Sequence, residues 1–376
     1  MAAGTIYIGR INTGYTHTEN EWANPAMINL NGGTAQVYQI VRDYRRSKSA
    51  SSRAFVNFNG GTLRTTHPKG AFGAPEAVCD AAGESCGVDR VTVFAGGGTF
   101  DTNGRDVSSR MPISAPVGQG VVAVSVPEAV LSKTFAAPPT VTIIGDGEGA
   151  SARVLFNPQS GKVTGVSVLS PGWGYTKARA RFNHGGYESL GEKVAELDDV
   201  VCGQFVKTGA GTYTFLCVNT VTDVKVAGGR IRNGVDNVFT SDAALTLDGG
   251  DYDVNGFSQT FKSIAFGTVG GKILNGTVTA GGLSCDFAAA AANHPGTADL
   301  SNVTFAPGAK TIVTGYDPAV CASADKVVLL NFPSGGAPSS VPPLDDAVVL
   351  PKGWTLRLTP TCLKLAKDGG MVLIFR

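Results

Sequence analysis

Three aspartates in one short stretch are the best candidates for acid and base chemistry. They are Asp248, Asp251 and Asp253. Hydrolysis of a glycosidic bond uses two carboxylates about 5 to 9.5 Å apart, and Asp251 and Asp253, two residues apart, would project from the same face of a strand. In the alternative reading they are exterior residues that alternate with buried Tyr252 and Val254. No basic residue stands beside them as the base of a lyase, which favours the structural reading.

Two aromatic residues near the middle of the chain are candidates for binding a carbohydrate. Trp173 and Tyr175 lie in a turn rich in glycine, and an aromatic ring can stack on the apolar face of a sugar. Alternatively, the same rings form the core of a small domain. The sequence leaves both readings open and favours the second.

The remaining polar residues do not form a pattern typical of a catalytic or metal site. Asp146 and Glu148 lie in a glycine-rich turn, but the turn lacks the repeated oxygen ligands that calcium requires. No lysine-serine pair follows, as a phosphate-binding loop would need, and there is no Cys-x-x-Cys pair. The four histidines stand far apart: His17, His67, His184 and His294. The sequence therefore predicts no catalytic residue, no cofactor, no metal and no enzyme activity.

Seven cysteines are present, and two of them are candidates for a disulfide. Cys79 and Cys86 bracket a short segment rich in turn-forming residues, so a local disulfide is plausible in an oxidising compartment. Because seven is odd, at least one thiol is unpaired or paired between chains. The alternative is that all seven are buried or inert thiols.

Composition indicates a folded protein rich in β-turns. Glycine accounts for 50 of the 376 residues, whereas 16% of residues are charged and 43% are hydrophobic, which argues against both collagen and disorder. The formal net charge of +1 creates no field that would attract nucleic acid. No apolar run approaches the length of a membrane-spanning helix, so we expect no insertion into a membrane.

Glycine pairs recur at a fixed spacing in the second half of the chain. They begin at Gly228, Gly249 and Gly270, at intervals of 21 residues, and apolar residues alternate around each pair. A repeat of about twenty residues is typical of one coil of a solenoid. Glycine suits the corner of a coil because a Cβ there would collide with the coil stacked above. The repeat predicts an all-β fold, a parallel β-helix or β-solenoid.

Two other regions interrupt or end this pattern. Four short strands separated by dense turns, at 140–144, 152–156, 163–169 and 178–182, predict a small antiparallel β module inserted into the solenoid. The closing segments 354–358 and 371–375 predict capping strands, preceded by a proline-rich linker or extended cover at 338–343. Short helices are expected at 187–197 and 286–293.

These patterns divide the chain into four expected regions. They are N-terminal β-solenoid coils with loop excursions at 1–137, the inserted module at 138–185, solenoid repeats at 186–332, and a C-terminal linker with capping strands at 333–376.

One stretch resembles a known family. The run from Gly203, with Lys207, Gly209, Gly211 and Thr212, is similar to the autotransporter-associated β-strand repeat, whose usual form is apolar-Lys-x-Gly-x-Gly-Thr after a glycine. Segments 224–232 and 245–259 resemble the elements that follow, and the likeness extends over about 29–278. The resemblance implies a parallel β-helix outside the cell or at the bacterial cell surface, with the adhesive or structural roles of an autotransporter passenger.

The expected function is a non-catalytic, extracellular structural or adhesive protein. Open solenoid ends present unpaired backbone groups, so we expect a homo-oligomer that stacks end to end into filaments or a surface layer. A surface glycan or a host ligand is a further expected partner. The two alternatives are a carbohydrate-active β-helix enzyme, either a polysaccharide lyase or a glycosidase, and a carbohydrate-binding or host-binding module.

Overall fold

The structure is a computed structural model that describes residues 5–8, 26–42, 54–66, 72, 87–184, 188–333 and 335–367. The described chain is mostly β, with long parallel sheets and an antiparallel module. It divides into two compact units: unit 1 comprises 1–63, 72–99 and 113–204, and unit 2 comprises 64–71, 100–112 and 205–376. The division passes through β6 (Thr62–Thr65) and β8 (Gly98–Asp101).

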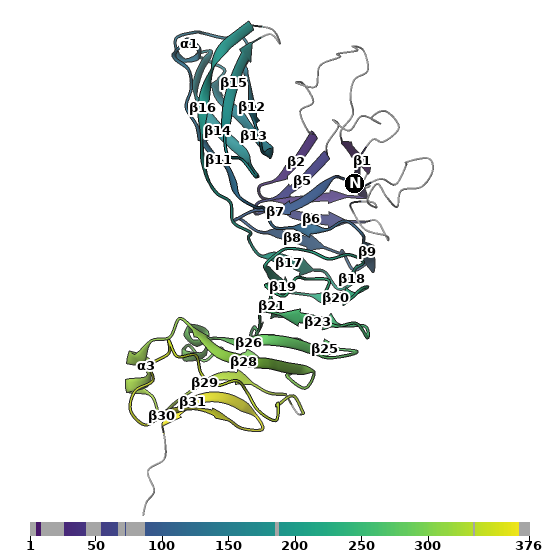
Figure 1. Cartoon of the computed structure of the whole chain (residues 1–376), viewed down its shortest axis with the longest axis vertical. Coiled ribbons are helices and arrows are strands. Elements are labelled where there is room, and N and C mark those ends of the chain that lie inside the picture. Colours follow the sequence, from purple (N-terminus) through teal and green to yellow (C-terminus); the bar gives the residue numbers. More distant parts are fainter. Residues whose placement is uncertain are drawn as a thin grey trace, which may run out of the picture. The chain divides into compact units, whose positions relative to one another are not determined.

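In unit 2, one parallel sheet pairs each strand with a strand that comes about twenty residues later. Phe205, Val224 and Leu245 are successive partners across it, separated by 19 and 21 residues. Figure 1 shows β17, β19 and β21 of this sheet side by side. In sheet order its strands are β23 (Gln259–Phe261), β26 (Val278–Asp286), β24 (Ser263–Phe266), β21 (Ala244–Leu247), β19 (Asp223–Val226) and β17 (Phe205–Thr208), with β28 (Val303–Thr314) paired to β26.

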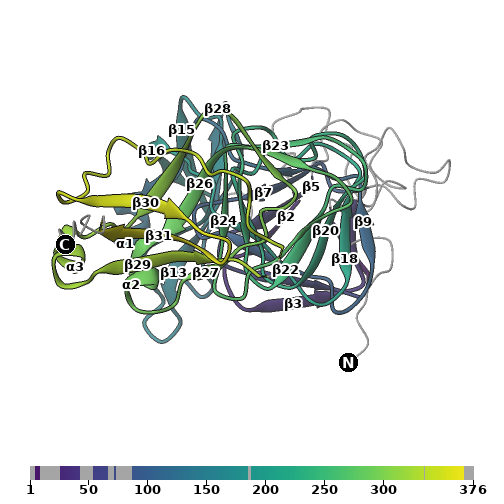
Figure 2. The same cartoon turned by 90° about the horizontal axis from the view of Figure 1, so that it is seen from below.

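A second parallel sheet of unit 2 follows the predicted repeat. Ile231, Tyr252 and Ile273 are successive partners at steps of 21 residues, and Gly229 pairs with Gly250. The equal spacing of the glycine pairs therefore corresponds to lateral pairing of parallel strands. Figure 2 separates β20 and β22 of this sheet from β24 and β26 of the first. In sheet order its strands are β25 (Ile273–Leu274), β22 (Gly250–Asp253), β20 (Gly229–Asn233), β18 (Thr212–Phe215) and β9 (Val107–Ser109).

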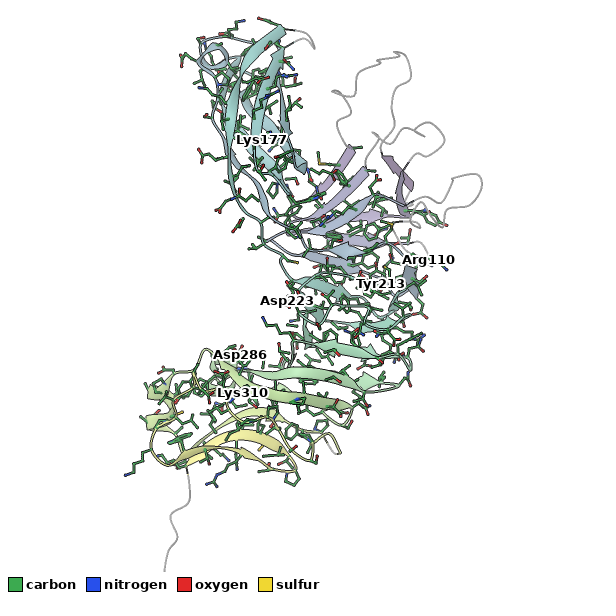
Figure 3. All side chains as sticks on the ribbon, viewed as in Figure 1. Arg110, Lys177, Tyr213, Asp223, Asp286 and Lys310 are labelled. Carbon is green, nitrogen blue, oxygen red and sulfur yellow. The ribbon has the colours of Figure 1, made fainter. Side chains whose placement is uncertain are left out.

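The interior of these repeats combines stacked aromatic rings with a hydrogen-bonded polar network. Tyr213, labelled in Figure 3, is fully buried, and its ring centroid lies 4.4 Å from that of Phe215. One turn further, the Tyr252 hydroxyl donates to Asn233 Oδ1 at 2.6 Å and lies 3.2 Å from Gln259 Oε1. Buried polar groups need such partners because an unsatisfied one is costly.

The turns of the repeats require glycine for lack of space. A Cβ added to Gly271 would lie 2.0 Å from the carbonyl oxygen of Gly250 in the preceding repeat. By contrast, a Cβ at Gly228 would make only ordinary contacts, the nearest at 3.5 Å. The predicted collision with the neighbouring coil is confirmed at Gly271.

Unit 1 contains a shorter parallel sheet whose strands are β10 (Ile113–Ser114), β7 (Arg90–Val93), β5 (Ala54–Phe58) and β2 (Ala26–Leu30). All five residues of β5 are buried. Successive side chains of a strand point to opposite faces, so both faces of this sheet are covered at β5. Its other parallel strands are β1 (Thr5–Ile8), which pairs with β4 (Gln39–Arg42), and β3 (Thr34–Val37), which lies beside β6.

The antiparallel module of unit 1 is larger than predicted. It runs from Gln119 to Asp199, because β11 (Gln119–Val124) and β16 (Glu188–Asp199) pair with each other outside the expected bounds of 138–185. The four predicted strands are present as longer ones, and a single short helix, α1 (Glu128–Leu131), follows β11. The four strands are β12 (Thr140–Gly145), β13 (Glu148–Asn157), β14 (Lys162–Trp173) and β15 (Ala178–His184).

The helix expected at 187–197 is wrong, because this segment forms β16. Its apolar residues Leu190, Val194 and Leu197 recur at a helical spacing. In the structure a register irregularity opposite Asn183 falls at Gly191, whose φ is +104°. A bulge of this kind shifts the two-residue alternation of a strand, and so it imitates helical periodicity.

The C-terminal part of unit 2 is an antiparallel sheet with two short helices. The strand predicted at Trp354–Leu358 is present as β30, whereas 371–375 lies outside the described residues. The helix expected at 286–293 is present as α2 (Phe287–Ala291), capped by Asp286, and α3 (Pro318–Ser323) follows. In sheet order the strands are β27 (Gly296–Thr297), β29 (Lys326–Asn331), β31 (Cys362–Lys367) and β30 (Trp354–Leu358).

The proline-rich segment contacts the edge of β28. The amide of Thr311 donates to the carbonyl of Pro343 at 2.7 Å, and the amide of Asp345 donates back to Thr311 at 2.9 Å. The Thr311 hydroxyl also donates to Pro342 at 2.7 Å. The segment therefore acts as an extended cover over this strand, one of the two roles expected for it.

Candidate functional site

The three candidate aspartates of unit 2 all accept ion pairs from the preceding repeat. Asp248 Oδ2 lies 2.7 Å from Lys225 Nζ, and Asp253 Oδ2 lies 2.8 Å from Arg232 Nε. Asp251 lies 3.9 Å from Arg230. The register of the sheets creates these pairs, because Arg230 is the lateral partner of Asp251 and Arg232 that of Asp253.

Asp253 has the environment of a permanent anion. Its side chain is 0% exposed, which corrects the expectation that it is an exterior residue. Burial alone would raise the pKa of this carboxyl, but hydrogen bonds from Asn275 and Arg232, with the backbone amide of Asn255, outweigh burial and hold the pKa below its usual value. A carboxyl with a lowered pKa is a poor general acid at neutral pH.

Asp251 is likewise engaged, since it accepts the backbone amide of Lys272 at 3.0 Å. Glycosidase chemistry needs one protonated and one ionised carboxyl, and the pair Asp251 and Asp253 offers no protonated member. The arrangement holds repeats together, and its chemistry is that of a charged ladder. Sequence reasoning missed Arg230 and Arg232, although the 21-residue period places each of them one repeat before an aspartate.

Asp146 uses its carboxylate to fix the turn that joins β12 to β13. It accepts hydrogen bonds from the Thr176 hydroxyl and from the backbone amides of Thr176 and Lys177. These bonds, the Thr176 hydroxyl foremost, hold the pKa of Asp146 well below its usual range. Its role in the structure is to staple two turns of the module.

Trp173 and Tyr175 are both buried, with exposures of 6% and 5%. Tyr175 belongs to a core cluster of the module with Val121 and Ala195, and burial raises its pKa to about 12. Little of either ring is open to a sugar. The structure thus places both residues where the second reading of the sequence put them, in a core.

Trp173 also joins the module to the parallel sheet of unit 1. Its ring lies edge-on to Phe55 of β5 with the centroids 5.2 Å apart, and the Arg90 guanidinium lies 4.5 Å above it. Nearby, Asn57 donates to the Ser170 hydroxyl at 3.2 Å. These contacts cover the second face of β5.

A groove of about 610 Å³ opens on the module itself. Its lining is largely apolar, and it includes Val194, which is 81% exposed. Lys177, labelled in Figure 3, and Arg179 also line it. Arg179 and Arg181 both pair with Glu192, at 3.0 and 2.7 Å, so these two side chains share one strand face, as their spacing predicts.

Lys207 is the most unusual titratable residue of the described chain. Its side chain is fully buried, and its Nζ donates to the carbonyl oxygens of Gly209 and Gly211 at 2.6 Å each and of Gly228 at 2.8 Å. The Thr102 hydroxyl lies 3.2 Å away. Alternation along β17 places Lys207 on the same inward face as Phe205, a signal that sequence reasoning did not use.

The cysteines that the structure describes carry free thiols: Cys202, Cys217, Cys285, Cys321 and Cys362. Burial raises the pKa of Cys217 to about 11 and that of Cys285 to about 12, so both are unreactive. Cys79 and Cys86 lie outside the described residues, and their disulfide stays a prediction. Within the described ranges, no three His, Cys, Asp or Glu side chains gather as metal ligands. Among the helices described, none is long and apolar enough to cross a membrane.

Comparisons of this chain with protein-family models, with curated proteins and with solved structures found no match.

Proposed function

We propose that this chain is a parallel β-solenoid that acts outside the cell as a non-catalytic structural or adhesive protein. The proposal rests on the resemblance of 203–215 to the autotransporter-associated repeat and on the way unit 2 uses its polar side chains. We propose an extracellular or bacterial surface location on the same resemblance.

One observation carries the non-catalytic part of the proposal. The carboxylates best placed for glycosidic chemistry, Asp251 and Asp253, are paired with arginines of the preceding repeat. A solenoid enzyme would leave such groups free to reach a substrate. Here they stabilise the stacking of strands, which is the work of a scaffold.

The proposed partners are further copies of this chain and a surface ligand. In unit 2, the edge of β28 is bonded to Pro343 and Asp345 through Thr311, so strand addition at that point would have to displace this cover. A paired edge resists edge-to-edge association. End-to-end stacking is therefore expected to use other edges, and negative-stain images of concentrated protein test it: filaments support stacking, and isolated particles contradict it.

The experiment on catalysis compares purified chain with its Asp251→Asn variant on a panel of acidic and neutral polysaccharides. Unsaturated uronates and new reducing ends are measured over a long incubation. The proposal predicts neither product from either protein. Product from the parent chain that disappears in Asp251→Asn would contradict it and favour the β-helix enzyme.

The adhesive part of the proposal is tested on a glycan array and on immobilised host matrix proteins. Because Trp173 is a packing anchor, Trp173→Ala would disturb the module and is a poor probe of binding. Val194→Asp is better suited, because Val194 is exposed in the groove. Binding that this variant reduces would support a ligand at the module, and absence of binding on every surface would contradict an adhesive role.

A further inference from the structure

The Lys207 ammonium sits among oxygens that resemble the coordination shell of a small cation. Four oxygens surround Nζ, three of them backbone carbonyls, at 2.6 to 3.2 Å. Rings of backbone carbonyls replace the hydration shell of potassium in selective channels. An ammonium has three N–H donors, so every donor of Lys207 has an acceptor inside the fold.

The surroundings of this group explain why its partners must be close. A buried charge without partners is very unfavourable. Burial lowers the pKa of Lys207 to about 8, against the opposing influence of Asp101 and Asp106. Asp101 is itself bonded to Arg64 at 2.7 Å, and Asp106 accepts the backbone amide of Thr212 at 2.7 Å. The direct contacts of Nζ are therefore the neutral oxygens.

The backbone around Nζ is shaped by glycine. Gly209 and Gly211 are two and four residues after Lys207, and Gly228 comes from the next repeat. A Cβ on Gly229 would lie 2.6 Å from Nζ and 2.4 Å from the oxygens of Gly209 and Gly211. Only glycine at Gly229 leaves room for the three carbonyls to converge.

We propose that the oxygens of Gly209, Gly211, Gly228 and Thr102 form a monovalent-cation site whose resident cation is the Lys207 ammonium. The ammonium neutralises the converging carbonyl dipoles and ties the turn after β17 to the turn of the next repeat. When the side chain is removed, the site takes a free primary ammonium ion or potassium in its place. This inference is independent of the proposed function.

The test is chemical rescue of Lys207→Ala in the full chain. Thermal unfolding is followed for the parent, for Lys207→Ala and for Lys225→Ala, a control lysine whose partner is the partly exposed Asp248. Each is measured with equal concentrations of chloride salts of n-propylammonium, ammonium, potassium and tetramethylammonium. n-Propylammonium matches the deleted atoms from Cγ to Nζ, whereas tetramethylammonium has no N–H donor.

Lys207→Ala is expected to melt well below the parent and below Lys225→Ala. n-Propylammonium should restore most of the lost melting temperature, ammonium and potassium a smaller part, and tetramethylammonium none. Equal effects of all four salts, or no rescue by any, would overturn the proposal. So would a Lys207→Met variant as stable as the parent, because methionine fills the space without the charge.

A second measurement uses the unaltered protein, in case Lys207→Ala does not fold. An ammonium held by three carbonyls exchanges its protons slowly, so nitrogen-detected NMR of 15N-lysine protein at pH 6.5 should show one protected ammonium signal that Lys225→Ala retains. Absence of a protected ammonium signal would contradict the resident-cation assignment.

Discussion

Two arginine–carboxylate pairs with nearly the same bond length show how differently the two main regions of the molecule are built. In the parallel repeats of unit 2, Arg232 Nε lies 2.8 Å from Asp253, whose side chain is fully buried. In the antiparallel module of unit 1, Arg181 Nε lies 2.7 Å from Glu192, whose side chain is 37% exposed. An exposed ion pair adds little stability, whereas breaking a buried one is costly.

The difference follows from how strands find their partners. In the module, turns bring consecutive strands together, as between β13 and β14, and its polar side chains face solvent. In the repeats, a residue's neighbour is the residue 18 to 21 positions later, as Tyr213 pairs with Ile231 and Ile231 with Tyr252. The chemistry of one repeat is therefore completed by the next, which is why Lys207, Arg232 and Asp253 find partners across repeats.

The largest effect is expected where the module meets the parallel sheet of unit 1. Trp173→Ala removes a ring packed on Phe55 and Arg90, and large-to-small changes of this kind cost about 3–5 kcal/mol. Hydrogen exchange should show faster exchange throughout β13 and β14. Trp354→Ala, an equally buried tryptophan of unit 2, should leave those amides unchanged. Unchanged exchange in Trp173→Ala would mean that the module does not depend on this anchor.

The next effect concerns the stacking of repeats. Gly271→Ala places a Cβ against the Gly250 carbonyl, and overpacking of this kind costs about 1–3 kcal/mol. Gly228→Ala has room for its methyl group and serves as the matched control. Urea unfolding of both variants measures the difference. Equal midpoints would contradict close stacking at this turn.

The two arginine–carboxylate pairs can be compared directly. Asp253→Asn removes the charge opposite Arg232 within a buried network, and loss of a charged hydrogen bond there should cost about 1.5–3 kcal/mol. Glu192→Gln alters a solvated pair, and its urea midpoint should not move measurably. A larger loss in Glu192→Gln would reverse the comparison between the regions.

The smallest effect is a difference in acid sensitivity. Because the folded pKa of Asp253 lies below its unfolded value of 3.8, the stabilisation that it contributes is fully present above that pH and is lost as the pH falls through the folded pKa. The free energy of unfolding measured from pH 5 to pH 2 should therefore fall less steeply in Asp253→Asn than in the parent. Parallel curves would show that Asp253 is not a stabilising anion.

Periodicity made the repeats predictable, because the glycine pairs at Gly228, Gly249 and Gly270 report a spacing that the strands obey. The extent of the module was not predictable in the same way. The bulge at Gly191 gave β16 a helical pattern, and the pairing of β11 with β16 joins residues about 75 positions apart in register. The roles of Trp173 and Lys207 depend on contacts across strands, which residue type alone does not reveal.

Distances along one row of the first parallel sheet of unit 2 test the stacking of repeats most directly. Val206, Lys225, Thr246, Ala265 and Ser284 are successive partners in this row. Nitroxide labels are attached through an encoded ketone residue, which leaves the native thiols untouched, at Val206 and in turn at Thr246, Ala265 or Ser284. Stacked parallel strands predict mean distances that grow by about 4.8 Å per step. Distances that do not increase steadily from Thr246 to Ser284 would contradict the account.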